Sequence, residues 1–324
     1  MRFMQRYLSL LFFSFSTLYA LEFSPSHFGI KTTYLRGSGK EKITSSPNFF
    51  QVLEEKMEPY QGQSLGVFYQ YLEKKRPYFH IEGNYRWIFS SNSHIYLEER
   101  VTSSFGALTF SEKLEAKASG YSYQGKVEAG YPFTFGPLTT LLKIGGFGEK
   151  EKIERFFPVT TFTASSGSTQ GTLSFFPVND LSHYELSPLT GIELILQPWP
   201  ASYLRLIAGY TYNFGWGKNR SKYESSSTIT QDSQSSSYFL TRRFSSRPFL
   251  ETHSLKLATL IRWASFLASS LEFHYIYKSA KPVTADLTLS GVAENTAIYQ
   301  QNLSQLNAQR MQLYGASFSL FVCF

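Results

Sequence analysis

Several features common in soluble enzymes are scarce in this chain. Its 324 residues include one cysteine, Cys323, so the chain forms no internal disulfide. Aspartate occurs three times, as Asp180, Asp232 and Asp286, all in segments that we expect to be loops. No GxSxG, HExxH, P-loop or Cys/His cluster is present. We therefore expect no enzyme, no metal site and no cofactor.

Long apolar runs are also missing beyond the amino terminus, which excludes transmembrane helices. Met1–Ala20 has a basic start at Arg2 and Arg6, an apolar core and a small residue at its end. This pattern predicts a signal peptide, removed after export near Ala20, and leaves residues 21–324 as a single domain. The alternative, a membrane anchor, needs a longer apolar core. An exported chain without disulfides needs another feature to stabilise its fold, such as the closed sheet of a β-barrel.

Aromatic residues are abundant instead: 17% of the chain is aromatic and 17% charged, with 30 Phe and 22 Tyr. They recur at alternate positions, most clearly in Tyr78–Phe89, where an aromatic and aliphatic row faces a row that contains Glu82 and Arg86. A soluble sandwich would rarely bury the charged row or expose the aromatic one. A membrane β-barrel with a polar lumen requires both.

The same period of two recurs in ten segments, and the connections between them alternate short and long. We predict an all-β fold, a single transmembrane antiparallel up-and-down barrel with short periplasmic turns and long extracellular loops. The expected strands are 27–36, 63–72, 78–89, 120–133, 138–148, 184–197, 204–216, 255–263, 271–277 and 309–324. The expected long loops are 90–119, 149–183, 217–248 and 280–308. If 90–119 forms a hairpin, the count becomes twelve strands.

The last strand, Gln309–Phe324, carries an apolar row that ends on the final residue. Its most apolar members are Tyr314, Phe318, Leu320, Val322 and Phe324. This pattern resembles the signal by which Gram-negative outer-membrane β-barrels are recognised by their assembly machinery. The resemblance implies location in the outer membrane, with its lipid, lipopolysaccharide and assembly machinery as partners and no nucleic acid. The aromatic, Ser-rich, nearly cysteine-free style also resembles chlamydial outer-membrane proteins.

Ten ionisable residues fall on the predicted inward faces, six basic and four acidic. They are Lys31, Glu82, Arg86, Lys126, Glu128, Lys143, Glu193, Arg205, Lys256 and Glu272. Either these charges pair and fill the lumen, or they line a narrow porin-like channel for small solutes. The basic excess then predicts a slight preference for anions. His80 and His274, also inward, are expected to be ordinary hydrogen-bonding residues.

The expected loop 217–248 is rich in basic residues. They are Lys218, Arg220, Lys222, Arg242, Arg243 and Arg247. A second hypothesis is therefore a non-conducting surface barrel whose basic loops bind polyanions, such as lipopolysaccharide, or act in adhesion. A third follows from resemblance: ten-stranded barrels include the omptin proteases, which this chain matches in size and hairpin plan but not in an acidic pair beside a histidine.

Overall fold

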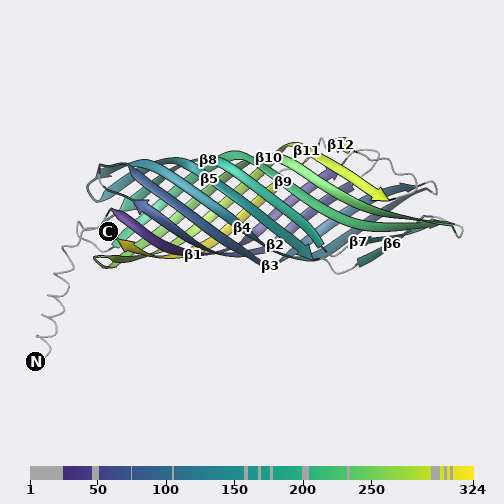
Figure 1. Cartoon of the computed structure of the whole chain (residues 1–324), viewed down its shortest axis with the longest axis horizontal. Helices are drawn as coiled ribbons and strands as arrows, with labels where there is room; N and C mark the ends of the chain where they lie inside the picture. Colours follow the sequence, from purple (N-terminus) through teal and green to yellow (C-terminus); the bar gives the residue numbers. More distant parts are fainter. Residues whose placement is uncertain are drawn as a thin grey trace, which may run out of the picture.

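The structure, a computed structural model, is built of β-strands along nearly all of its described length (Figure 1). It describes residues 25–45, 51–73, 75–103, 106–156, 160–166, 169–175, 178–198, 204–231, 234–292, 300–302, 305–306 and 309–324. The predicted signal peptide, Met1–Ala20, and Asp232 lie outside these ranges. Within them, no helix is long and apolar enough to cross a membrane.

Ten long strands form the wall of a barrel. They are β1 (Ser26–Ser45), β2 (Gln51–Tyr71), β3 (Tyr78–Ser103), β4 (Gly106–Phe135), β5 (Leu138–Phe156), β8 (Val178–Leu196), β9 (Leu204–Gln231), β10 (Gln234–Ala264), β11 (Leu267–Val292) and β14 (Gln309–Cys323). Each pairs antiparallel with its neighbours, and β14 pairs with both β11 and β1, which closes the sheet. The predicted ten-stranded up-and-down barrel is confirmed, and the alternative of twelve strands is wrong.

Short connections gather at the end of the barrel where β1 begins and β14 ends, here called the near end (Figure 1). One of the tightest joins β4 to β5 through Gly136 and Pro137. Gly136 has a φ of 59°, in the left-handed region that favours glycine. The opposite end is called the far end below.

The predicted long loops are wrong over most of their length, because the strands continue through them toward the far end. Residues 90–119 extend β3 and β4, and the residues expected in the other loops extend β5, β8, β9, β10 and β11. Asp180 lies in β8 and Asp286 in β11, so both are strand residues. A membrane is crossed by about ten strand residues, and β10 has 31. Beyond the apolar zone the sequence no longer alternates between an apolar row and a charged row, while backbone pairing continues.

Four shorter strands complete the far end. β6 (Thr160–Ser166) and β7 (Thr169–Phe175) form a hairpin, and β7 pairs with β9 beyond the point where β8 begins. β12 (Gln300–Asn302) pairs with β11, and β13 (Gln305–Leu306) pairs with β1. These pieces continue the sheet where the long strands lose their neighbours.

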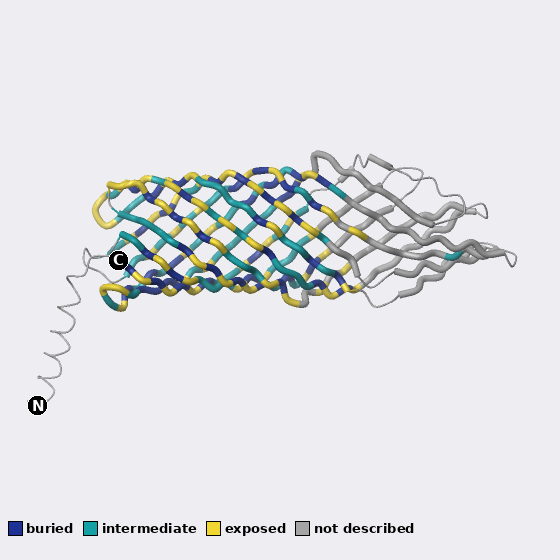
Figure 2. The backbone as a smooth tube through the Cα atoms, viewed as in Figure 1, coloured by how far each residue is buried: buried dark blue, intermediate teal, exposed yellow. Residues whose placement is uncertain are grey.

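Buried and exposed residues alternate along the strands, as Figure 2 shows in blue and yellow. The ambiguous segment 138–148 illustrates the rule: Leu141 faces inward and is 0% exposed, whereas Leu142 faces outward and is 49% exposed. Lys143 therefore points into the lumen, as predicted. The outward apolar side chains of the near half, here called the apolar band, cover all ten strands. They include Phe28, Ile30, Leu65, Val67, Phe79, Ile81, Val127, Ile144, Ile192, Leu194, Leu206, Leu257, Leu271, Phe273, Phe318 and Leu320. An exposed apolar surface of this extent fits lipid and not water.

Candidate functional site

An alternating series of lysines and glutamates crosses the lumen in the near half. We call it the ion-pair chain, and its members in order of contact are Glu272, Lys31, Glu82, Lys126, Glu128, Lys143, Glu193 and Lys256. Nitrogen and oxygen atoms of successive members lie 2.6–3.6 Å apart. Its centre is the most enclosed part, with the side chains of Lys143 and Glu128 3% and 2% exposed. All eight residues belong to the predicted inward set.

The ion-pair chain has four lysines and four glutamates, so these eight groups carry no net charge. The basic excess predicted from sequence therefore lies in the remaining two residues, Arg86 and Arg205. Arg86 lies closer to the far end of the barrel, with its Nη1 3.5 Å from Oε1 of Glu149. Arg205 lines the near part of the lumen. Mutual neutralisation removes most of the reason to expect anion preference.

Two histidines lie beside the ion-pair chain and form hydrogen bonds. Nε2 of His80 lies 3.1 Å from Oε2 of Glu82, and Nε2 of His274 lies 2.7 Å from Oγ of Ser317. Both face inward and both hydrogen-bond, as the sequence predicted.

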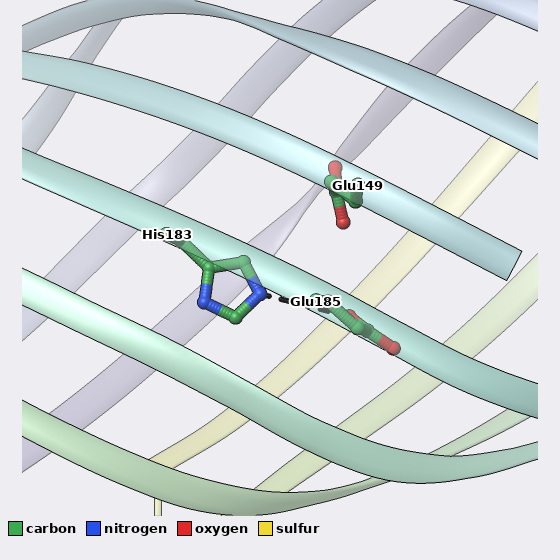
Figure 3. Close-up of side chains that lie close together, drawn as sticks. All are labelled: Glu149, His183 and Glu185. Carbon is green, nitrogen blue, oxygen red and sulfur yellow. Dashed lines mark ion pairs between the residues drawn. The ribbon is translucent and has the colours of Figure 1, made fainter.

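A second polar group, the far network, lies beyond the ion-pair chain. Nζ of Lys278 lies 2.5 Å from Oε2 of Glu185 and 3.4 Å from Oε2 of Glu149. It also lies 3.2 Å from Nε2 of His183, which faces Glu185 across 3.6 Å (Figure 3). Glu149, His183 and Glu185 are close enough to hold a metal ion together. The ammonium of Lys278 contacts all three, so a metal ion would have to displace it.

Two cavities occupy the described lumen. The near cavity has a volume of about 230 Å³ and is bordered by the ion-pair chain, while the far cavity has about 250 Å³ and is bordered by the far network. Four residues line both, namely Phe147 of β5, Asn213 of β9, Ser254 of β10 and Ile276 of β11. We call these four the dividing layer.

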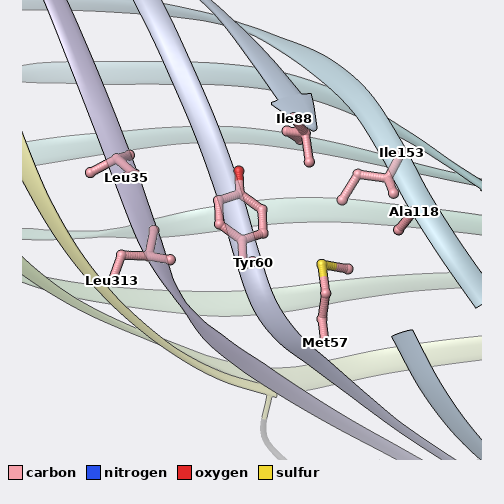
Figure 4. Close-up of a cluster of buried hydrophobic side chains, with 7 residues drawn as sticks. All are labelled: Leu35, Met57, Tyr60, Ile88, Ala118, Ile153 and Leu313. Carbon is pink, nitrogen blue, oxygen red and sulfur yellow. The ribbon is translucent and has the colours of Figure 1, made fainter. Parts of the chain in front are cut away.

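Apolar clusters occupy the interior on either side of this polar region. The near apolar cluster contains Phe68, Leu260, Ala268, Phe321 and Cys323. The far apolar cluster contains Leu35, Met57, Tyr60, Ile88, Ala118, Ile153 and Leu313, which gather inside the wall in Figure 4. The lumen of the near half is thus filled by side chains rather than left as a wide channel, as expected when only ten strands enclose it.

Basic side chains form a belt on the outer surface, just beyond the far edge of the apolar band. Lys218 is the register partner of the exposed Tyr184, and Arg220 follows two positions later on the same face. Tyr184 is flanked on its other side by Lys150 of β5. The basic belt consists of Lys150, Lys152, Lys218, Arg220, Lys222 and Arg247. Aromatic side chains border it, including Trp216 and Phe249, whose rings lie 5.2 Å apart.

The prediction that the basic residues of 217–248 lie in a loop is wrong. Its residues lie in β9 and β10 and not in a loop. Arg242 and Arg243 also belong to β10, as register partners of Tyr223 and Lys222, but their side chains lie outside the described part. The structure adds Lys150 and Lys152, which sequence reasoning missed.

Sequence reasoning also missed the far network. The expected loop 149–183 contains Glu149 and His183, because charged stretches indicate exposure to solvent. No site role is predicted for Glu185 or Lys278. The signal was nevertheless present: Glu149 keeps the parity of Lys143 on β5, and Glu185 keeps that of Glu193 on β8. Extending the period of two past the apolar band would have placed them inward.

The five residues of the terminal apolar row all face outward and are exposed. They are Tyr314, Phe318, Leu320, Val322 and Phe324. This places them in the apolar band, on the strand that closes the barrel against β1.

No family model matches the sequence, and no curated protein matches it. Solved structures do resemble the fold. The outer-membrane protease OmpT from Escherichia coli aligns with a TM-score of 0.54 and 10% identity, covering 94% of this chain and 99% of that one. The transport unit of the autotransporter AIDA-I from Escherichia coli aligns with a TM-score of 0.32 and 7% identity, covering 93% and 90%. A mutant of the monoaromatic hydrocarbon channel TodX gives 0.30 and 8%, covering 93% and 91%. At such identities the likeness to OmpT concerns the fold, which is that of an outer-membrane β-barrel.

Proposed function

We propose that this protein is a non-conducting outer-membrane barrel that acts on its outer surface, where the basic belt binds the phosphate groups of lipopolysaccharide. The observation that carries the proposal is a contrast between charges. Inside, the lysines of the ion-pair chain are neutralised by glutamates within 3.6 Å. Outside, the belt collects six basic residues on β5, β9 and β10, with Glu154 paired to Lys152 and Asp180 in register with Lys222.

The position of the belt supports a lipid partner. Aromatic side chains prefer the interface between hydrocarbon and headgroups, and Tyr184 and Trp216 are 53% and 60% exposed at this level. Cations just beyond such aromatics stand where lipid phosphates lie. Each basic residue near an anionic membrane surface contributes about 1 kcal/mol of attraction.

Two measurements on the folded protein test the proposal. In a planar bilayer we expect no steady conductance, because side chains of the dividing layer separate the two cavities of the lumen. Binding to lipopolysaccharide micelles should weaken as salt rises, since screening shortens the range of the attraction. Replacing Lys218 and Arg220 by Glu should reduce binding at least about tenfold, from the loss and reversal of two charges. Arg36→Glu is the matched control, because Arg36 is exposed on β1, across the barrel from the belt.

Equal loss of binding in the control and the belt variant would show that any exposed basic residue contributes to binding of lipopolysaccharide. The assignment of binding to the belt would then be wrong. A folded protein that conducts steadily would end the non-conducting part.

The second candidate is the narrow porin-like channel. The observation in its favour is that two cavities follow one another along the lumen and meet at the dividing layer. If conduction occurs, Phe147→Ala should raise the conductance by joining the cavities. Replacing Lys126, Arg205 and Lys256 by Glu should reduce or reverse any preference for anions. Unchanged currents in both variants would place the path outside the lumen.

We propose no enzymatic role, and the protease activity in the name of OmpT is not carried to this chain.

We also propose that Met1–Ala20 directs export and that the terminal row ending at Phe324 directs assembly in the outer membrane. Deletion of Phe324 should then lower the amount of folded protein, measured by the change of gel mobility on heating. Normal assembly without Phe324 would contradict the assignment.

A further inference from the structure

Apolar side chains from several strands contribute to the walls of the far cavity. They are Met57, Phe147, Ile153, Leu181, Leu250, Ile276, Met311 and Leu313. Charged groups of the far network and the amides of Gln124, Asn213 and Asn219 also line it. A volume of about 250 Å³ whose lining combines apolar and polar groups suits a small amphipathic molecule.

Two polar atoms in this wall lack a partner within the described structure. Nε of Arg86 has no acceptor although it is buried, and Oδ1 of Asn213 has no donor. Asn213 is 7% exposed and belongs to the dividing layer at the base of the cavity. A buried donor or acceptor without a partner costs about 1–3 kcal/mol, so such atoms mark places where a bound group would be stabilised.

The charged groups that line the far cavity leave a donor of Arg86 available to an anion. Its acidic residues are Glu149, Glu151 and Glu185, and its basic residues are Lys40, Arg86, Arg155, Lys278 and Arg310. The acidic groups are already engaged: Glu149 and Glu185 by Lys278, and Glu151 by the hydroxyl of Tyr60 at 3.5 Å. Lys40 and Arg310 are exposed register partners on β1 and β14 with the outward parity of Tyr34 and Tyr314, so the basic side chains that face the cavity are Arg86, Arg155 and Lys278.

We infer that the far cavity is a binding site for a small amphipathic anion, a carboxylate with an apolar body. The carboxylate accepts from Nε of Arg86, while the apolar body lies against Ile153, Leu250 and Ile276. Arginine suits this role because its planar N–H groups match a carboxylate. This site is independent of the basic belt, so failure of the lipid-binding proposal leaves it standing, and its own failure leaves the belt standing.

The test uses the full folded protein in nanodiscs of zwitterionic lipid, with 4-fluorobenzoate as the probe and 4-fluorobenzylamine as its cationic counterpart. Fluorine NMR titration should show saturable binding of the carboxylate and none of the amine. Ile276→Trp, which fills the cavity, should abolish binding. Arg86→Gln should weaken it about tenfold through loss of a charged hydrogen bond. Arg36→Gln, on the outer face of β1 and outside the belt, is the control and should bind as the unaltered protein does.

Gel mobility before and after heating establishes that each variant is folded. If Arg86→Gln fails to fold, Asn213→Leu replaces it, with weakened binding again expected because the unpartnered amide oxygen is removed. The inference is overturned if the folded unaltered protein shows no saturable binding of 4-fluorobenzoate, if it binds the amine equally well, or if binding persists in Ile276→Trp.

Discussion

The near and far halves of the barrel use one sheet in two different ways. In the near half the outside is apolar and the inside holds the ion-pair chain, in which each charged group contacts an opposite charge. In the described far half the outside carries the basic belt, and the inside combines an apolar cluster with a cavity. Surroundings explain the difference: next to lipid the wall must be apolar, so the polar groups lie inside. Beyond the lipid the outer face is free to be charged, and apolar packing stabilises the interior.

The largest expected effect on the amount of folded protein comes from placing a lysine on the outside of each half. Phe318 lies in the middle of the apolar band, where a lysine facing lipid costs about 2–4 kcal/mol. Phe318→Lys should sharply reduce the folded fraction, because the closing strand is affected. Phe156→Lys makes the same change at the far end of β5 and should fold normally. Heat-modifiable gel mobility measures both, and equal folding of the two variants would show that the apolar band does not face lipid.

The next effect concerns the ion-pair chain. Lys143 bridges Glu128 and Glu193 at 3.2 and 2.6 Å, so Lys143→Met leaves two buried carboxylates with one lysine each. Removing one partner of a buried ion pair destabilises by about 3–5 kcal/mol. Urea unfolding of the refolded protein should show this loss. Lys150→Met on the outer face is the control, and an equal loss there would mean that burial of the ion pairs contributes nothing.

A somewhat smaller effect is expected for the interior of the far half. Leu35 is buried in the far apolar cluster beside Tyr60 and Leu313. Leu35→Ala should cost about 2–5 kcal/mol, toward the lower part of that range if neighbouring side chains close the gap. Leu65→Ala, on the lipid-facing side of β2, should cost less in the same urea experiment. The reverse order would indicate that the far cluster is loosely packed.

The smallest expected effects on stability come from replacing a glycine by alanine on the inner face and on the outer face of the barrel. A Cβ at Gly209 would lie 3.1 Å from Cγ of Glu193, so Gly209→Ala crowds the ion-pair chain and should destabilise slightly. A Cβ at Gly83 would meet nothing within 4 Å, so Gly83→Ala should stabilise by about 0.4–1 kcal/mol through a less flexible unfolded chain. Thermal unfolding in detergent measures the two shifts, and shifts of the same sign would contradict the proposed contrast.

Prediction from sequence succeeded where the two faces of a strand differ in chemistry. In Tyr78–Phe89 the rows of Phe79 and Glu82 are so unlike that phase and direction follow from the residues alone. It failed beyond Ser90 and Gly217, where apolar and polar residues no longer alternate clearly and a long strand has the composition of a loop. Consequently the inward position of the Lys31 and Glu82 side chains was predicted, and that of Glu149 and Lys278 was not.

By itself, the sequence determined the class of fold, the ten strands, and which residues of the near half face inward, because a period of two assigns every residue to a face. The tertiary structure decided which of those residues meet. Glu272 and Lys31 are 241 positions apart and become ion partners because the barrel closes through β14. The neutrality of the ion-pair chain, the dividing layer and the grouping of Lys150 with Lys218 all depend on register between strands. Register follows from closure of the whole sheet, which no single segment encodes.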